Sequence, residues 1–283
     1  MTVVAQPSRR GKESVKQHWE AETCGIRYGT TLDEDSSYFA QIRSARYRLE
    51  PYILGFQDAP SAAGKDVLEV GVGAGSDFIQ WPNAGAKATG IDLTRAGVST
   101  TRRHLIAEGH ADSAGRVFVG DAEQLPFRDE SFDIVYSFGV LHHSPDTLRA
   151  LEEAHRVLRK GGTARIMIYH SPSWTALMLW VRYAFLAGRW AKTTRDVVFE
   201  RLESPGTKVY TDSEAMEMMH SAGFVNVRMR AQLGPGDLLT IQPSARYRAA
   251  MYRVVWALYP RFIVRALGNR FGLGLMIEAE RSH

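Results

Sequence analysis

Residues 67–77, VLEVGVGAGSD, are the stretch that decides the fold. An apolar run typical of a buried strand leads directly into Gly71, Gly73 and Gly75. Glycines allow positive φ and let a ligand approach the main chain without interference from a Cβ. A helix that begins just beyond such a turn offers free N–H groups to an anionic ligand group. The stretch therefore predicts a strand, a ligand-binding turn and a helix, in that order.

A carboxylate at the end of the next apolar run extends this pattern. The run 88–91 is followed by Asp92, which lies 21 residues after Gly71. This is close to the spacing of about 20 residues at which an acidic side chain accepts hydrogen bonds from a ribose. Turn and acid together indicate an adenosine-containing ligand. A dinucleotide fingerprint would place glycine at the sixth position from Gly71, where Ser76 stands, so NAD and FAD are disfavoured.

Short apolar runs alternate with helical patterns through the rest of the chain. Helices are predicted at 94–109 and at 144–160, the second with Ser144 as its cap and Pro145 at its first position. Thr211 and Glu214 form a capping-box pattern that opens a later helix. The alternation predicts a parallel sheet with right-handed crossovers. The predicted strands are 67–70, 88–91, 116–119, 133–137, 164–169, 225–231 and 273–279.

Composition narrows the class of protein. The 283 residues carry 35 basic and 31 acidic side chains, a mild excess that does not imply nucleic acid. The single cysteine, Cys24, excludes an intrachain disulfide and fits a reducing compartment. The N-terminus lacks the apolar core of a signal peptide. The apolar stretch 174–190 is short for a membrane span and contains Arg182, so we expect a lid helix, no stable membrane insertion and a cytoplasmic location.

Four ordered motifs carry a family resemblance. They are VLEVGVGAGSD, GIDLT, GDAEQLPFRDESFDIVYSFGVLHH and EAHRVLRKGGTARI. Together they resemble the motifs of class I S-adenosylmethionine-dependent methyltransferases, and most closely the ubiquinone/menaquinone-type and natural-product group. The resemblance covers residues 65–170, with a weaker echo at 210–231. It implies an α/β fold with a Rossmann-like, seven-stranded, mostly parallel sheet, helices on both faces, and S-adenosyl-L-methionine as the cofactor.

The resemblance also assigns residues to the methionine end of this cofactor. It implies that Glu69 and the main chain at Gly71 lie near the methionine amino group. Phe138 and Gly139 would border the methionine arm at the end of the fourth strand. The close approach of the cofactor would be permitted by the two remaining glycines of the turn, Gly73 and Gly75.

Four further residues are assigned to the adenosine end. The resemblance implies that Asp92 binds the ribose hydroxyls and that Leu93 packs on the adenine. Asp121 would accept a hydrogen bond from the adenine amino group, and the main-chain N–H of Ala122 would donate to the ring. A carboxylate at position 121 can select an exocyclic amine because it accepts the amine's hydrogen.

In the resembled fold, three segments cover the pocket as an α-helical lid. We expect an N-terminal cap at 1–60, a cofactor-binding core at 61–170, a lid insertion at 171–209, core again at 210–231, a second lid insertion at 232–270 and a last core strand at 271–283. The cap contains a helical repeat of apolar residues that ends before Pro51. That repeat consists of Phe39, Ile42, Ala45 and Leu49.

The two insertions are apolar and aromatic, which favours an acceptor with a large hydrophobic body. Their apolar residues are Trp174, Leu177, Met178, Trp180, Tyr183, Phe185, Tyr247, Tyr252, Trp256, Tyr259 and Phe262. The second insertion also has spaced arginines, which could bind an anionic group, touch a membrane surface or face solvent. These are Arg246, Arg248, Arg253, Arg261, Arg265 and Arg270.

Three histidines are the candidates for catalysis. His142 and His143 follow the fourth strand, and His170 follows the fifth, at the sheet edge where the pocket of an open α/β fold lies. Histidine can serve as a base near neutral pH or orient the acceptor. No metal is expected, because no local cluster supplies further ligands and Asp146 suits the first turn of the next helix better.

The sequence therefore predicts an enzyme that transfers methyl groups to N or O, and less readily to C, of a lipophilic or polycyclic small molecule in natural-product biosynthesis. An RNA methyltransferase is an alternative, although SFGVLHH stands where amino-methylating nucleic-acid enzymes carry Asp/Asn-Pro-Pro-aromatic, and we expect no nucleic-acid partner. A cofactor-binding protein without methyl transfer is another alternative. A homodimer stays open.

Overall fold

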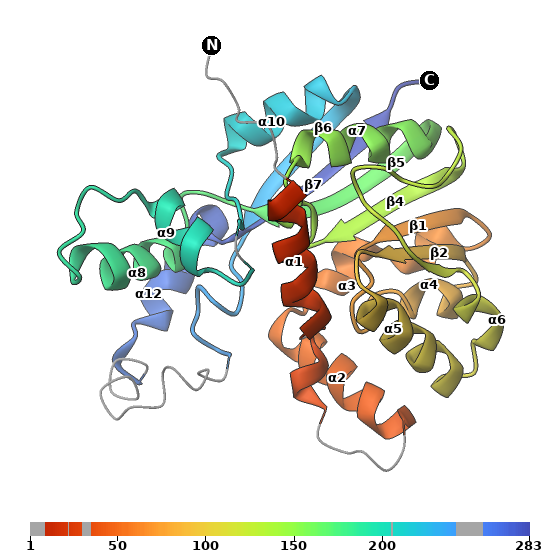
Figure 1. Cartoon of the computed structure of the whole chain (residues 1–283), viewed down its shortest axis with the longest axis horizontal. Helices are drawn as coiled ribbons and strands as arrows, with labels where there is room; N and C mark the ends of the chain where they lie inside the picture. The colour runs from red at the N-terminus through yellow and green to blue at the C-terminus, as the bar shows by residue number, and fades with distance from the viewer. Residues whose placement is uncertain (1–8, 22, 30–34, 205, 242–256) are drawn as a thin grey trace.

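The computed structural model describes residues 9–21, 23–29, 35–204, 206–241 and 257–283, and contains one seven-stranded sheet (Figure 1). The strand order is β3-β2-β1-β4-β5-β7-β6. All neighbours run parallel except β7, which is antiparallel to β5 and β6. This confirms the predicted Rossmann-like, mostly parallel sheet. The strands are β1 Asp66–Val70, β2 Lys87–Asp92, β3 Val117–Val119, β4 Phe132–Phe138, β5 Leu158–Tyr169, β6 Phe224–Gln232 and β7 Gly274–Arg281.

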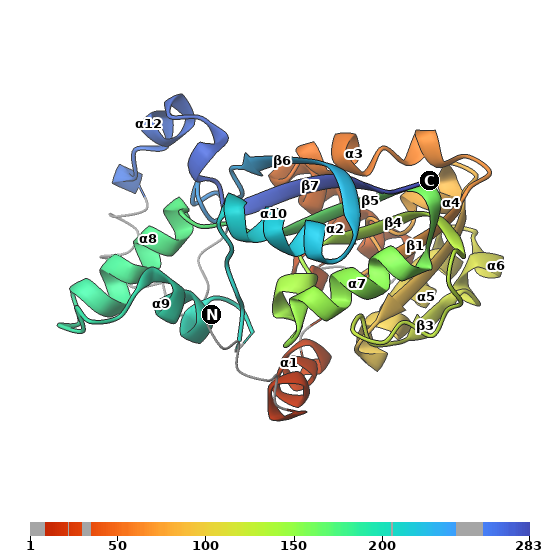
Figure 2. The same ribbon diagram turned by 90° about the horizontal axis from the view of Figure 1, so that it is seen from above.

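Helices cover both faces of the sheet, as expected. One face packs on α7 (Thr147–Val157) and α10 (Asp212–Ser221), which lie side by side in Figure 2. The other face packs on α3 (Tyr52–Gln57), α4 (Gln80–Asn83) and α5 (Arg95–Ala107). Alternation along β1 divides its residues between the faces: Leu68 and Val70 belong to the first core, and Val67 belongs to the second. The short α6 (Ala111–Ala114) precedes β3.

Helix caps show where the sequence prediction holds and where it is wrong. Thr94 caps α5 by accepting from Gly97 N, and the capping box of Thr211 and Glu214 opens α10, as predicted. The predicted cap Ser144 is wrong, because Asp146 accepts from Arg149 N and α7 begins at Thr147. Ser144 Oγ instead donates to Glu123. The helix also ends earlier than predicted, at Val157, where β5 follows at once.

The N-terminal cap is helical. It contains α1 (Arg9–Ala21), the 3-10 turn Ile26–Tyr28, α2 (Asp35–Leu49) and the 3-10 turn Ala59–Ala62. The predicted repeat is confirmed in α2, where Phe39, Ile42 and Ala45 are buried and the helix ends before Pro51. In Figure 1, α1 lies in front of the carboxyl ends of the central strands, and α2 lies beyond it.

The two insertions form a lobe at one side of the sheet (Figures 1 and 2). The first contains α8 (Trp174–Trp180), a π-helical turn (Val181–Phe185) and α9 (Thr194–Arg201), and the second contains α12 (Arg261–Ala266) and the 3-10 turn Asn269–Phe271. Buried Asp237 joins them, because its carboxylate accepts from Thr175 N, Thr175 Oγ1, Gly234 N and Leu273 N. Tyr247, Tyr252, Trp256, Arg246, Arg248 and Arg253 lie outside the described residues.

Among the described residues, every helix is too short or too polar to cross a membrane. Residues 174–190, which the sequence predicts as a lid helix, form α8 and the π-helical turn and then leave the helical conformation.

Candidate active site

The glycine turn lies at the carboxyl end of β1, as predicted. Gly71, Gly73 and Gly75 all have positive φ, of 85°, 52° and 79°. A Cβ at Gly71 would fall 2.2 Å from a methyl carbon of Val140, so only glycine fits there. At Gly73 the nearest atom to such a Cβ is 3.6 Å away, the carbonyl oxygen of Cys24. The turn thus presents main chain, not side chains, at this edge of the sheet.

Asp92 connects this turn to the start of α5. Its Oδ2 accepts from Gly73 N at 3.0 Å, and its Oδ1 accepts from the N and Oγ1 of Thr94 at 2.9 and 2.7 Å. The side chain is half-buried, as is Leu93 beside it. A carboxylate can accept about four hydrogen bonds, so Asp92 retains capacity for a further donor. The arrangement fits a ribose diol in front of the glycine turn.

Asp121 follows β3 and is held from two sides. Its Oδ2 lies 2.6 Å from Lys12 Nζ of α1, and its Oδ1 accepts from Glu123 N at 2.9 Å. Lys12 also bonds the Glu123 carboxylate, at 2.5 Å. The side chain of Asp121 is 32% exposed. Ala122 is half-buried and packs against the core under α7.

Glu69 has a different environment from the expected one. Its side chain is buried on the α4 side of the sheet, where its Oε2 accepts from Trp81 Nε1 at 2.7 Å. Burial, with the nearby charge of Asp77, raises the pKa of this carboxyl well above its usual value. The Glu69 carboxyl is therefore held by Trp81 on this face of the sheet, and burial favours its uncharged form. The strand alternation explains this position, because Val67 and Glu69 share the face that packs on α4.

An ion pair that the sequence analysis missed lies near Phe138, at the expected methionine end. Arg46 of α2 bonds Asp77 through Nε at 2.7 Å and through a second nitrogen at 2.5 Å. The guanidinium carbon of Arg46 lies 5.3 Å from the ring centroid of Phe138. Phe138 and Gly139, whose φ is 77°, end β4 beside this pair. The signal in the sequence was weak, since one arginine in a helix is usually solvated.

Helix α1 crosses both halves of the site. Lys12 contacts Asp121, as described above. Glu20, one residue before the other end of the helix, accepts from Arg95 N and Ala96 N at the start of α5, at 2.9 and 3.1 Å. The ring of Trp19 packs edge-on against His143, with centroids 5.3 Å apart. One helix thus contacts the expected adenosine end and the histidine pair.

His142 and His143 lie together in the 3-10 turn Leu141–His143, where their ring centroids are 4.2 Å apart. His142 has no exposed surface and stacks on Tyr169 of β5, with centroids 3.8 Å apart. Among the described residues, neither of its ring nitrogens has a hydrogen-bond partner. Burial, together with the neighbouring His143, lowers its pKa well below the usual value, so the ring is neutral and holds a free lone pair.

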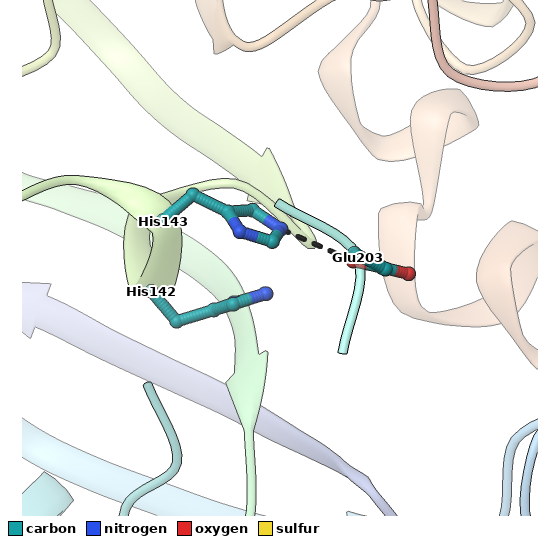
Figure 3. Close-up of side chains that lie close together, drawn as sticks. All are labelled: His142, His143 and Glu203. Carbon is teal, nitrogen blue, oxygen red and sulfur yellow. Dashed lines mark ion pairs between the residues drawn. The ribbon is translucent and has the colours of Figure 1, made fainter. Parts of the chain in front are cut away.

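His143 faces a loop of the first insertion (Figure 3). Its Nδ1 lies 2.9 Å from Ser204 Oγ and 3.0 Å from Thr207 Oγ1, and its Nε2 lies 3.2 Å from Glu203 Oε2. Tyr169 donates its hydroxyl to the other oxygen of Glu203 at 2.8 Å. Sequence reasoning missed Glu203 because it lies 60 residues after His143, and no local spacing connects the two.

His170 does not join this cluster. Its Nδ1 lies 3.1 Å from the carbonyl oxygen of Gly272, and its Nε2 lies 3.3 Å from an oxygen of Asp212. Both nitrogens therefore face groups that connect β5 to β7 and α10. The structure thus brings together two of the three candidate histidines.

The central part of the sequence is similar to known methyltransferases. Residues 68–166 match the family described as "Methyltransferase domain". A phthiotriol/phenolphthiotriol dimycocerosates methyltransferase of Mycobacterium ulcerans is 45% identical over 104 residues, which are 35% of this chain and 36% of that protein. The 27-O-demethylrifamycin SV methyltransferase of Amycolatopsis mediterranei is 34% identical over 126 residues, 44% of each chain. The match therefore spans less than half the length of either relative.

A solved structure agrees over almost the whole chain. Geranyl diphosphate C-methyltransferase from Streptomyces coelicolor A3(2) has a TM-score of 0.61 to this protein at 17% sequence identity. The superposition covers 97% of this chain and 99% of that one. At this identity the likeness shows the fold alone, including helices outside the family match.

Proposed function

Because residues 68–166 are a class I S-adenosylmethionine-dependent methyltransferase domain, we propose that this chain methylates an oxygen atom of a lipophilic small molecule. The domain assignment agrees with the sequence resemblance and with the cofactor class that it implies. The observation that carries the proposal is the junction of two features at one sheet edge. The glycine turn with Asp92 follows β1, and buried His142, whose ring nitrogens have no hydrogen-bond partner within the described part of the chain, follows the neighbouring strand β4.

The residues present fit the cofactor at its adenosine end. Asp92 would bind the ribose hydroxyls, Leu93 would pack on the base, and Asp121 with the N–H of Ala122 would bind the adenine edge. Support comes from the half-buried Asp92 carboxylate, which has capacity for further donors, and from the Gly73 position, where a side chain is absent. S-adenosylmethionine supplies a methyl group bound to a sulfonium sulfur. When the methyl group is transferred, that sulfur becomes a neutral thioether.

The methionine end is proposed with one change from the sequence expectation. Gly71, Gly75, Phe138 and Gly139 would border the methionine arm. Glu69 is buried and bonded to Trp81 on the α4 side of the sheet, so we assign the polar contacts there to the Arg46 and Asp77 pair instead. A guanidinium that is already held by one carboxylate can still donate to a second, because it has five N–H groups.

The acceptor would meet the histidine pair. Methyl transfer from a sulfonium depends mainly on aligning the acceptor atom with the methyl group and on excluding water. A hydroxyl acceptor also needs a group that removes its proton or accepts a hydrogen bond from it. His142 and His143 are the groups positioned for this, while His170 is held by Gly272 and Asp212 and would support the sheet edge.

The acceptor class rests on the insertions and on the relatives. Apolar side chains of the lobe are exposed, among them Leu177 (43%) and Phe185 (52%). The two relatives named above are described as acting on phthiotriol lipids and on a rifamycin. We therefore propose a hydroxylated polyketide or lipid acceptor, and a place in specialised metabolism.

The proposal is tested by methyl transfer itself. The full chain would be incubated with S-adenosylmethionine carrying a labelled methyl group and with a panel of hydroxylated macrolactones, ansamycins and long-chain diols. Label should move to an organic-soluble product, with S-adenosylhomocysteine formed in equal amount. Cofactor binding without turnover on any acceptor would favour a binding protein, and label in RNA would favour the nucleic-acid alternative.

A further inference from the structure

We propose that His142, His143 and Glu203 form a binding site for a divalent first-row transition-metal cation (Figure 3). One ligand atom from each residue lies within 4.8 Å of the others. The sequence alone predicts no metal, because it shows no third ligand near the histidines. The third ligand comes from the first insertion, which the fold brings back to the end of β4. Metal binding itself is independent of the proposed function, and only its catalytic role rests on it.

His142 contributes an imidazole that the protein leaves unused. Its ring is fully buried, and among the described residues neither nitrogen has a hydrogen-bond partner. Buried polar groups are almost always hydrogen-bonded, so an exception requires an explanation. A ring nitrogen of His142 lies near the imidazole of His143 and the carboxylate of Glu203. A cation bound between these three groups would explain why the structure provides this nitrogen with no hydrogen-bond partner among the described residues.

The proton count at His143 points to the same conclusion. Thr207 Oγ1 donates to the Ser204 carbonyl at 2.7 Å and lies 3.0 Å from His143 Nδ1, so in the tautomer that carries its hydrogen on Nδ1 it accepts from the ring. In that tautomer the Nε2 lone pair faces Glu203 Oε2 at 3.2 Å. Two acceptors at this distance need a cation between them.

The contacts behind the three ligands match those of known metal sites. A metal-bound histidine usually donates its other N–H to a protein oxygen, and Thr207 Oγ1, 3.0 Å from His143 Nδ1, can accept such a bond. Ligating carboxylates are likewise hydrogen-bonded, and Tyr169 donates to Glu203 Oε1 at 2.8 Å. Glu203 has a left-handed backbone, with φ of 54°, a conformation that is costly for glutamate and that concentrates at functional sites.

The donor set determines the class of cation. Two imidazole nitrogens and one carboxylate oxygen suit Zn²⁺, Fe²⁺, Co²⁺ or Mn²⁺ and leave positions open for a substrate atom. Mg²⁺ and Ca²⁺ prefer ligands that are all oxygen. The side chain of Glu203 is 38% exposed, so one side of the cluster is accessible. If the proposed function holds, a cation here would polarise the acceptor hydroxyl.

The test titrates the full, untagged, metal-stripped chain with Co²⁺ in the absence of cofactor and acceptor. Visible d–d absorption should saturate at one Co²⁺ per chain, and Zn²⁺ but not Mg²⁺ should displace it. Glu203→Gln and His142→Ala should each weaken Co²⁺ binding at least tenfold. Glu200→Gln and His220→Ala, which change an exposed glutamate of α9 and an exposed histidine of α10, should bind as the parent does.

Two results would overturn the proposal. The first is no stoichiometric Co²⁺ binding, which would leave a proton, in an imidazolium–glutamate pair, as the explanation of the His143 contact. The second is binding that survives both Glu203→Gln and His142→Ala, which would place the cation elsewhere. Thermal unfolding of each variant distinguishes lost ligands from a lost fold. Co²⁺ binding by a chain that transfers no methyl group would contradict the proposed function but support the metal site.

Discussion

The Nζ of Lys12 lies 2.6 Å from Oδ2 of Asp121, so the first helix is bonded to the carboxylate that the sequence assigns to the adenine. Lys12 and the carboxylates of Asp121 and Glu123 are only partly exposed, and this proximity lowers the pKa of Glu123 and raises that of Lys12. The same carboxylate would therefore serve two partners, one within the chain and one in the cofactor.

Asp121→Asn should affect both partners. The loss of charge removes the ion pair to Lys12 and weakens the adenine contact, so we expect cofactor affinity to fall about tenfold and α1 to become more susceptible to protease at Lys12 and Lys16. Calorimetry and limited proteolysis measure the two effects. Asp112→Asn, at an exposed position of α6 before β3, is the control and should change neither. Unchanged affinity would remove Asp121 from the adenine site.

Asp92→Ala should weaken S-adenosylmethionine binding about 10- to 100-fold, since hydrogen bonds to a charged group contribute about 1.5–3 kcal/mol. Asp92 also holds Gly73 N and Thr94, so Asp92→Asn should recover part of the stability but not the full affinity. Isothermal calorimetry with each folded variant measures this. A parent-like affinity in Asp92→Ala would contradict the ribose assignment.

The histidines should separate by their effect on turnover. His142→Ala and His143→Ala should each lower kcat roughly 10²–10⁴-fold, the range for a group that assists proton transfer or acceptor activation, with little change in cofactor affinity. His170→Asn should lower kcat far less, because its ring nitrogens face Gly272 and Asp212. Equal losses in all three variants would show that the sheet edge, not the histidine pair, had been damaged.

Glu69 makes stability depend on pH. Its folded pKa is raised, mainly by burial, so the protonated carboxyl stabilises the fold fully below the unfolded pKa of about 4.3. That stability is lost as pH rises toward the folded pKa, because the unfolded chain ionises first. Glu69→Gln, which can still accept from Trp81, should therefore gain free energy of unfolding over the parent between pH 5 and pH 8. Urea denaturation at both values measures this, and a pH-independent difference would show that Glu69 is ionised.

Glu153, a buried residue of α7, tests the first core without touching the site. Its side chain is 4% exposed and accepts from Arg149, Arg156 and Leu125 N. Glu153→Ala leaves the buried Leu125 N without its partner and removes one carboxylate from Arg149 and Arg156, so it should cost about 2–4 kcal/mol. Glu152→Ala, one residue earlier and paired with Arg149 at the surface, should cost at most about 0.5 kcal/mol. Similar costs in the two variants would contradict the buried network.

The sequence predicted those features that depend on neighbouring residues. The strand positions, the glycine turn after β1 and the place of Asp92 at the end of β2 follow from the spacing of apolar runs, and the structure has them there. The alternation along β1 puts Glu69 on the same face as Val67, under α4, which the resemblance did not indicate. Asp146 caps α7 in place of the predicted Ser144, whose hydroxyl donates a hydrogen bond to Glu123 instead.

Glu203 could not have been found in this way. It reaches His143 only because the chain leaves β5, forms two helices and returns, and no periodicity encodes that path. The contacts of α1 were inaccessible for the same reason, since Lys12 and Asp121 are 109 residues apart.

The position of α1 has a kinetic consequence. Lys12 holds it at the adenosine end, and Trp19 packs on His143 seven residues later in the same rigid helix. One rigid helix therefore contacts both the carboxylate assigned to the adenine and the histidine pair assigned to the acceptor. Under the proposed function, displacement of α1 would uncover both groups at once, so the release of two products would require one movement of this helix rather than two independent ones.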